Sequence, residues 1–567
     1  MAKIDILEKL AEDNLTIYPI EALKNEALSY TLAIFQPSEN ITANENEVKN
    51  VNSDSIDLKY SSFFQMTNEY GIDLVLAPEY SCPWLTVVNQ FENSFPERGV
   101  LWVLGCESIT IPELKCIISQ NSDKVKFIVE DLDALNSRGT KNFLDPIIYC
   151  FNATNNSGGN EKIVLIQFKR RNMVDHEMQL ERRHLIVGKN YYELMNDENS
   201  ARLITMICAE AIQYDLELVL DKAYIIPHLQ LNTAPFHPSF MDYRLKIFKE
   251  RKNVEVICVN WAKGFEINGS SQSKYGASAY YMHTDKINYT DTRINENHKK
   301  GIYYTYSTSQ HYHRFLFNYN EHVFYLNSNQ LLQNDSANIS QLRDGIETIN
   351  TFSWNDSWVE CTSCDDNWDG YLDSYGYLSR VSFLSSSSPI SKERFLNLTS
   401  GNKLKSVKWY EPKNLKSFYI DSDEKPSKLS VFFDPRVIDA SKLKEYTNNV
   451  HWLKRKVINS NISYPNKFSS LESVNDFTIY EEDIKSHLNV VNDSLSATFV
   501  GLGSDSVINA ERVYSNISDA IKEEERTLVV WYENDDGDPE FYSENNNNID
   551  ADFTESRKSI TNDREGE

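Results

Sequence analysis

Short apolar runs, each closed by polar or turn-forming residues, recur through the first 330 residues of the chain. Runs of this length that are rich in β-branched and aliphatic residues predict buried strands. Strands of this kind in succession predict an α/β fold. The predicted strands span residues 30–37, 72–79, 100–107, 161–169, 202–212, 224–227, 254–261 and 275–283.

Three of these strands deliver residues that carry chemistry. Glu79, Lys169 and Cys208 each stand at the C-terminal end of an apolar run. In α/β sheets, ligands and catalytic groups gather at that end of the strands. A general base, a cation that stabilises an oxyanion and a nucleophile are the groups that acyl transfer from an amide-like carbon requires.

Cys208 lies where a strand turns toward a helix. Backbone N–H groups at such a turn lower the pKa of a thiol, so we expect a thiol that is partly ionised near neutral pH. The alternative is a buried packing cysteine, because free cysteines are among the most buried residue types.

The order and spacing of these runs resemble the nitrilase, or carbon–nitrogen hydrolase, superfamily over roughly residues 25–330. The resemblance rests on the first strand with Gln36 and a following proline, the strand that ends in Pro78-Glu79, and the lysine strand. It also rests on the cysteine strand and on a later strand that ends at Asn260. This resemblance implies a four-layer αββα sandwich over residues 1–330 and a reaction that needs neither a metal nor an organic cofactor.

The resemblance also implies a role for each site residue. Glu79 would be the general base and Cys208 the nucleophile. Lys169 and the backbone N–H of Ala209 would stabilise the oxyanion. Glu177, eight residues after the lysine, would orient Lys169 and the leaving group.

Some residues near the expected site leave alternatives open. Glu181 lies one helical turn after Glu177 and could take its role. Arg170, Arg171 and Asn232 are expected to contact the substrate, and the two arginines favour an anionic group because guanidinium binds carboxylate and phosphate. The alternative is that these arginines pair with nearby acidic residues on a solvated face.

The chain of 567 residues exceeds what one hydrophobic core supports, so we expect further domains. Residues 331–425 are polar and rich in serine and asparagine, which predicts a loop-rich connecting region. Residues 426–534 alternate apolar runs with helical patterns and predict a smaller α/β accessory domain. Residues 535–567 are acidic and poor in apolar side chains, which predicts a disordered tail.

Composition narrows the function classes. No stretch approaches about eighteen consecutive apolar residues, and the first twelve residues predict an amphipathic polar helix rather than a signal peptide. The net charge of −26 argues against a general nucleic-acid surface. Eight cysteines without paired spacing indicate a reducing, cytoplasmic location. Cys361 and Cys364 lack the partners of a zinc site.

We therefore expect an amidase-type hydrolase that acts on an amide- or nitrile-like small molecule and forms a homodimer or higher homo-oligomer. The alternative is a nitrilase-like binding, assembly or effector subunit of a multi-protein bacterial system of the phage-defence type, with a protein partner bound through the C-terminal domain. A glutaminase fused to an NAD synthetase is excluded, because that enzyme needs a Ser-Gly-Gly-x-Asp-Ser loop. The Ser-Gly-Gly of this chain, 157–159, continues with Asn-Glu.

Overall fold

The computed structural model forms two compact units, residues 1–366 with 422–424, and residues 367–421 with 425–567. The residues that the structure describes are 2–24, 29–136, 141–172, 179–213, 222–233, 235, 238–251, 253–262, 264–271, 278–283, 297, 300–307, 312–318, 320–329, 346–361, 490–491, 496–504, 506–520, 527–533 and 539–542.

One sheet of the first unit has ten strands. Glu79 lies on a central strand of this sheet, and Lys169 directly follows another of its strands. The central strands β3, β6 and β7 are parallel, and β9 and β10 follow as an antiparallel pair. The order is β23 (Trp358–Glu360), β22 (Ile346–Trp354), β21 (His322–Asn329), β3 (Ser29–Gln36), β6 (Leu74–Cys82), β7 (Leu101–Cys106), β9 (Pro146–Asn155), β10 (Asn160–Phe168) and β8 (Lys126–Ile128), with β2 (Leu15–Ile17) on β9.

The second sheet has nine strands, and Cys208 directly follows one of them. Its strands β12, β14 and β15 are parallel, and β14 and β15 are buried along their whole length, as expected of strands covered on both faces. The order is β1 (Ala2–Asp5), β11 (Asn190–Met195), β12 (Arg202–Ile204), β14 (Tyr224–Leu229), β15 (Val254–Val259), β18 (Ala279–His283), β20 (Tyr312–Phe317) and β19 (Ile302–Ser307), with β13 (Met206–Ile207) on β14.

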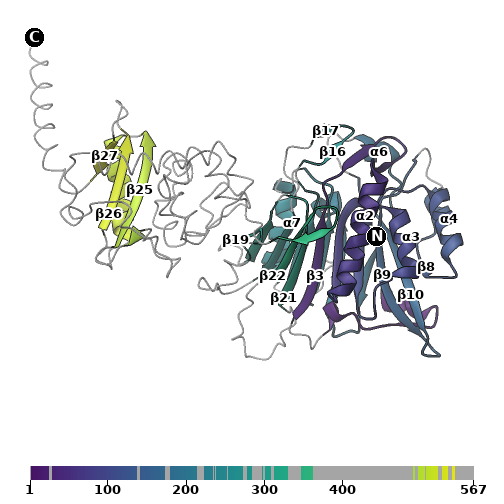
Figure 1. Cartoon of the computed structure of the whole chain (residues 1–567). Helices are drawn as coiled ribbons and strands as arrows, with labels where there is room; N and C mark the ends of the chain where they lie inside the picture. The colour runs from purple at the N-terminus through teal and green to yellow at the C-terminus, as the bar shows by residue number, and fades with distance from the viewer. Residues whose placement is uncertain are drawn as a thin grey trace, which may run out of the picture. The chain divides into compact units, whose positions relative to one another are not determined.

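The two sheets pack face to face, with helices on their outer faces (Figure 1). Across the interface, Tyr30 donates to Glu255 at 2.6 Å and the Gln167 side chain donates to the Thr205 carbonyl at 3.1 Å. Apolar side chains of α2 (Ser53–Glu69), α3 (Trp84–Asn93) and α4 (Ile111–Asn121) share a core with the first sheet, and α7 (Pro238–Glu250) covers the second. The expected four-layer αββα sandwich is confirmed.

Shorter elements complete the first unit. Two of them, α6 and the 3₁₀ helix η2, carry site residues. They are α1 (Ile6–Ala11), η1 (Glu21–Leu23), α5 (Leu132–Asn136), α6 (Gln179–His184), η2 (Cys208–Gln213), and a small sheet of β4 (Asn40–Ala43), β5 (Val48–Asn50), β16 (Glu266–Ile267) and β17 (Ser270–Ser271). None of the helices in the described parts of the chain has the length and apolar content needed to cross a membrane.

Two boundaries of the sandwich differ from those predicted. The first residues form β1 and pair with β11 before the helix α1 begins, so the predicted terminal helix is too long. The sandwich also continues past residue 330, because β22 and β23 extend the first sheet beyond β21. The sequence hides β22 because its apolar residues, Ile346, Ile349, Phe352 and Trp354, lie two or three positions apart among polar ones and lack the period of two of a half-buried strand.

The described residues of the second unit form one small sheet of β24 (Val490–Val491), β25 (Ser496–Ser504), β26 (Thr527–Glu533) and β27 (Pro539–Tyr542). Helix α14 (Val507–Ala520) connects the parallel strands β25 and β26. This β-α-β unit agrees with the expected α/β character. The start predicted for the tail, residue 535, is wrong, because β27 pairs with β26. Residues 362–489, which include most of the predicted connecting region and the first part of the predicted accessory domain, and residues 543–567 lie outside the described residues.

Candidate active site

Glu79 is placed by a local irregularity of β6. The register of β6 against β7 shifts between Ala77 and Cys82, and Tyr80 has a φ of +58°. The side chain of Glu79 is buried, and its Oε2 accepts a hydrogen bond from the Leu231 N–H at 2.6 Å. Its backbone carbonyl accepts from the Trp261 indole at 2.8 Å. Residues of the second sheet region therefore hold both the carboxylate and the backbone of Glu79.

Gly105 on β7 makes this arrangement possible. A Cβ at Gly105 would lie 2.6 Å from the Cα of Glu79, which is far inside van der Waals contact. We predict that Gly105→Ala displaces Glu79 and destabilises the first unit by about 3 kcal/mol. Urea unfolding measures the loss, and mass spectrometry of the Cys208 peptide measures any change in its alkylation rate.

The matched control for this change is Gly71→Ala. Gly71 has a φ of +61° and open space where its Cβ would lie. It should lose about 1–2 kcal/mol from backbone strain alone and leave the alkylation of Cys208 unchanged. Equal alkylation rates in both variants would show that Gly105 does not position Glu79.

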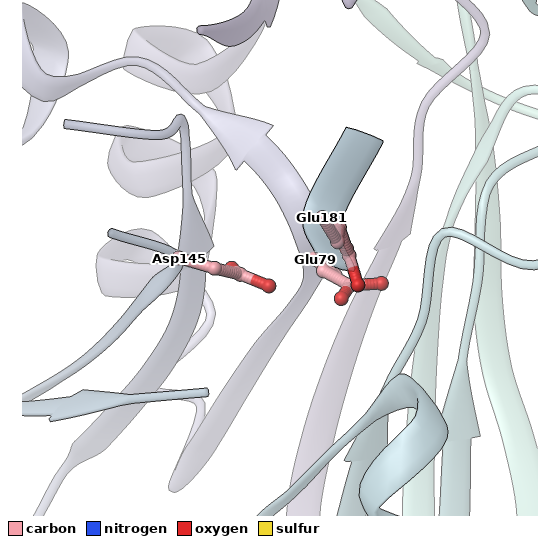
Figure 2. A group of neighbouring side chains, drawn as sticks. All are labelled: Glu79, Asp145 and Glu181. Carbon is pink, nitrogen blue, oxygen red and sulfur yellow. The ribbon is translucent and has the colours of Figure 1, made fainter. Parts of the chain in front are cut away.

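Lys169 follows the last residue of β10 and is also buried. Its Nζ donates to Glu79 Oε1 and to Glu181 Oε1, each at 2.6 Å, and lies 3.5 Å from Asp145 Oδ2. Figure 2 shows the three carboxylates converging from different elements. Burial alone would lower the pKa of Lys169, but Glu181, Glu79 and Asp145 raise it well above its usual value. The ammonium is therefore charged at neutral pH.

Cys208 is the first residue of η2, directly after β13, and has a φ of +37°. This left-handed conformation is uncommon for a residue other than glycine and is typical of constrained sites. The thiol is buried, and burial followed by the charge of Glu79 raises its pKa well above the usual value, against the opposing effect of Lys169. The expectation of a partly ionised thiol is wrong for the resting site, because a carboxylate and burial both disfavour the thiolate.

Glu210 connects the lysine segment with the cysteine segment. Its Oε1 accepts from the Arg170 backbone N–H at 2.7 Å and from Nε at 3.0 Å, and its Oε2 accepts from the Ile207 N–H at 2.9 Å. The Arg170 side chain is buried in this pair. The Arg170 guanidinium therefore holds Glu210 beside the cysteine turn, in a buried place rather than on the solvated face of the alternative interpretation, and its contact with a substrate stays a prediction.

The remaining expected residues have mixed outcomes. Glu177 lies outside the described residues, and the carboxylate of Glu181 on α6 contacts Lys169. Ala209 follows Cys208 in η2. Asn232 is buried, and its backbone N–H donates to Asn260 Oδ1 at 3.0 Å. Arg171 is partly buried. Nothing tests their contact with a substrate, which stays a prediction.

Asp145 belongs to the site, although the sequence analysis missed it. It stands directly before β9, the antiparallel neighbour of the lysine strand, and its backbone carbonyl accepts from the Lys169 N–H at 2.9 Å. A carboxylate directly before the apolar run that pairs with the lysine strand was the signal that could have found it. Tyr80 was missed too, and its hydroxyl donates to Glu181 Oε1 at 3.1 Å.

The carboxylates of Glu79, Asp145 and Glu181 offer oxygens that lie within 4.8 Å of one another, which is the spacing of a metal-binding group. Lys169 already donates to two of these carboxylates from within the cluster. An ammonium in that position repels a second cation. The donor set therefore fits the lysine better than a metal ion.

His228 on β14 contacts the backbone of the turn that carries Cys208. Its Nε2 lies 2.9 Å from the Cys208 carbonyl oxygen, and its Nδ1 lies 2.6 Å from the Tyr243 hydroxyl. A carbonyl only accepts, so Nε2 carries the hydrogen and Nδ1 accepts from Tyr243. Burial lowers the pKa of His228 to about 3. The imidazole is therefore neutral at pH 7 and donates to the turn that holds the thiol.

We predict that His228→Leu destabilises the first unit by about 1–3 kcal/mol at pH 7, because the Cys208 carbonyl loses its donor in a buried place. The folded pKa of His228 lies below its unfolded value of about 6.5, so its contribution is lost as pH falls from about 6.5 to about 3. Urea unfolding at pH 7 and pH 5 should show a smaller pH dependence in the variant. An unchanged pH dependence would contradict a buried neutral His228.

No family model matches the chain, and no curated protein matches it. Among solved structures, an amidase from Nesterenkonia sp. aligns at 12% identity and a TM-score of 0.25, over 45% of this chain and 83% of that one. Saccharomyces cerevisiae Nit3, described as a member of branch 10 of the nitrilase superfamily, aligns at 16% identity and a TM-score of 0.23, over 45% and 83%.

A glutamine-dependent NAD⁺ synthetase from Acinetobacter baumannii aligns at 14% identity and a TM-score of 0.29, over 65% of this chain and 56% of that one. The αββα sandwich described above is the fold that the resemblance to the nitrilase superfamily implied, and the chemistry of the site is inferred from its own geometry.

Proposed function

We propose that the first unit is a carbon–nitrogen hydrolase of the amidase type that works through a thioester on Cys208. The observation that carries this proposal is the buried Lys169, which binds Glu79 and Glu181 at 2.6 Å each while its charge acts on the Cys208 thiol. A thiol at a strained turn beside a carboxylate base and a charged ammonium is the set of groups that acyl transfer needs.

The thiol is protonated at rest, so the reaction begins with transfer of its proton to Glu79. The thiolate then attacks the carbonyl carbon, and Lys169 with the Ala209 N–H stabilises the oxyanion. The C–N bond breaks as Glu79 returns the proton to the leaving nitrogen, and ammonia departs. Glu79 then takes a proton from water, which attacks the thioester; the C–S bond breaks, Glu79 returns the proton to the Cys208 sulfur, and the acid is released. Glu181 holds Lys169 in position throughout.

Ammonia release tests this proposal directly. The purified chain is incubated with a panel of short aliphatic, aromatic and acidic primary amides and with the matching nitriles. Intact-mass measurement during turnover should show a mass increase equal to one acyl group, located on the Cys208 peptide. Release of ammonia without an adduct on that peptide, or no release from any member of the panel, would contradict the proposal.

The second candidate function is a nitrilase-like binding or effector module within a larger bacterial system. The burial of the site favours it, because the side chains of Lys169 and Cys208 are each only 1% exposed. A module of this kind would retain a small molecule without converting it. Mass spectrometry of small molecules that co-purify with the Cys208→Ala protein distinguishes the two, since an unchanged ligand found equally with the wild-type chain favours binding alone.

A further inference from the structure

The charges of the buried site do not balance if every carboxyl group is ionised. Glu79, Asp145 and Glu181 are all buried, and Lys169 is the ammonium that contacts them. Among the described residues, the Lys169 ammonium can balance only one of the two fully buried charges if Glu79 and Asp145 are both ionised, which leaves one uncompensated negative charge in a region of low dielectric constant; the side chain of Glu181 is partly exposed. Burying even one such charge costs several kcal/mol, and groups in this position bind a proton instead.

The contacts show which carboxyl group is suited to the proton. Glu79 accepts from Lys169 and from the Leu231 N–H, and Glu181 accepts from Lys169 and from the Tyr80 hydroxyl. Asp145 is fully buried, and among the described residues neither of its side-chain oxygens has a partner in good hydrogen-bond geometry, although the Tyr80 hydroxyl and the Glu79 carboxyl group lie close to it. Its nearest cation, Lys169, lies at 3.5 Å, longer than the two other contacts of that lysine. An ionised Asp145 would therefore be the least satisfied of the three.

We propose that Asp145 is a neutral carboxylic acid at pH 7 that donates a hydrogen bond to Glu79 and thereby keeps Glu79 ionised as the base for the Cys208 thiol. Its protonation stands on the contacts alone, whereas its role as a positioning residue rests on the function proposed above. Asp145 and Glu79 are neighbouring carboxyl groups that share one proton and titrate as a pair. If Asp145 holds this proton, Glu79 is ionised and can accept the proton of the thiol; if Glu79 holds it, Glu79 cannot.

The groups that face Asp145 are Glu79 and Tyr80 from β6, Lys169 from the end of β10, Glu181 from α6 and, through its electrostatic effect, Cys208 from η2. Burial first and then the charge of Glu79 raise the pKa of Asp145 well above its usual range, and Lys169 opposes them. This direction agrees with the proton placement that the contacts indicate.

The first test compares the wild-type chain with Asp145→Asn, in which a neutral amide donor replaces the proposed neutral acid. The infrared spectrum of the wild-type chain at pH 7 should contain the C=O band of a buried protonated carboxyl group, and Asp145→Asn should lack it. A spectrum without this band, or a band that persists in the variant, would overturn the proposal.

The pH dependence of the melting temperature gives an independent test. The difference in melting temperature between Asp145→Asn and the wild type has one sign if Asp145 is neutral and the opposite sign if it is ionised. An Asp145 whose pKa is raised in the folded state costs stability as pH rises above its unfolded value of about 3.9. Asp145→Asn should therefore melt at a higher temperature than the wild type at pH 8, by about 2 °C or more, with the gap closing as pH falls to 4. A variant that is less stable than the wild type at pH 8, or that does not fold, would show that an ionised Asp145 is required and would overturn the proposal.

The control is Asp133→Asn, which removes an exposed carboxylate paired with Lys115. Its melting temperature should follow that of the wild type at every pH, because exposed pairs contribute little.

The role of Asp145 is tested on the thiol itself, which requires no substrate. At pH 7, Asp145→Leu should slow iodoacetamide alkylation of the Cys208 peptide about tenfold, because Glu79 without its donor has a higher pKa, holds a proton at rest and is no longer free to accept the thiol proton, and Asp145→Asn should restore most of the rate. Equal rates in the two variants would overturn the positioning role. A failure of ammonia release with these results intact would count against the hydrolase and not against the protonated Asp145.

Discussion

Replacement of Cys208 by alanine is expected to lower kcat for ammonia release by about 10⁵-fold or more, because the thioester can no longer form. The fold should survive, since the side chain is small and loses one buried sulfur atom, and the free energy of unfolding should change by about 1 kcal/mol or less. Ammonia release and urea unfolding of the same preparation measure both quantities.

The matched control is Cys116→Ala, which removes an exposed cysteine on α4. It should leave both turnover and stability unchanged. Because Cys116 is exposed, it also reacts readily with alkylating reagents, so labelling of Cys208 has to be followed on its own peptide. Residual turnover in Cys208→Ala at a tenth of the wild-type rate would exclude Cys208 as the nucleophile.

Replacement of Lys169 by methionine is expected to cost about 3–5 kcal/mol of unfolding free energy at pH 7, because it leaves buried carboxylates without their cation. The folded pKa of Lys169 is raised, so its stabilising contribution is fully present below the unfolded value of about 10.4 and is lost only as pH rises through the folded value. Urea unfolding at pH 7 and pH 5 measures the loss. The loss of unfolding free energy should be smaller at pH 5, because the buried carboxylates left without a cation bind protons more readily there and so lose their negative charge.

Lys115→Met is the control for this change. The Lys115 ammonium pairs with Asp133 on the surface, where both side chains are largely exposed. Its loss should cost about 0–1 kcal/mol. A loss in Lys169→Met no larger than that of Lys115→Met would mean that the buried carboxylates do not depend on the lysine.

The residues that the sequence predicted best are those at the ends of apolar strands. Glu79 and Lys169 each close or follow a run that the periodicity marks clearly, and their strands β6 and β10 run in the same direction within one sheet, with β7 and β9 between them. The structure places their side chains 2.6 Å apart. Glu181 was weighed beside Glu177, but periodicity alone could not decide which carboxylate turns toward the lysine.

The residues that the sequence did not reveal act through partners distant along the chain. Asp145 enters the site because β9 runs antiparallel to β10, and no local pattern specifies that pairing. His228 sits inside an apolar strand, where it has the appearance of an ordinary core residue until Cys208 is seen 2.9 Å away. Arg170 was expected to contact the substrate, and its buried pairing could not be predicted because it depends on Glu210, forty residues further on.

The strands beyond residue 330 have a practical consequence for any attempt to produce the sandwich alone. Ending the chain at residue 330 would remove β22 and β23 and leave the full length of β21 as an open edge. That edge includes Val323 and Phe324, which are now buried. A long apolar edge with unpaired N–H and C=O groups pairs with other copies of itself, so such a fragment would aggregate, whereas a fragment ending after residue 361 keeps its native protective strands.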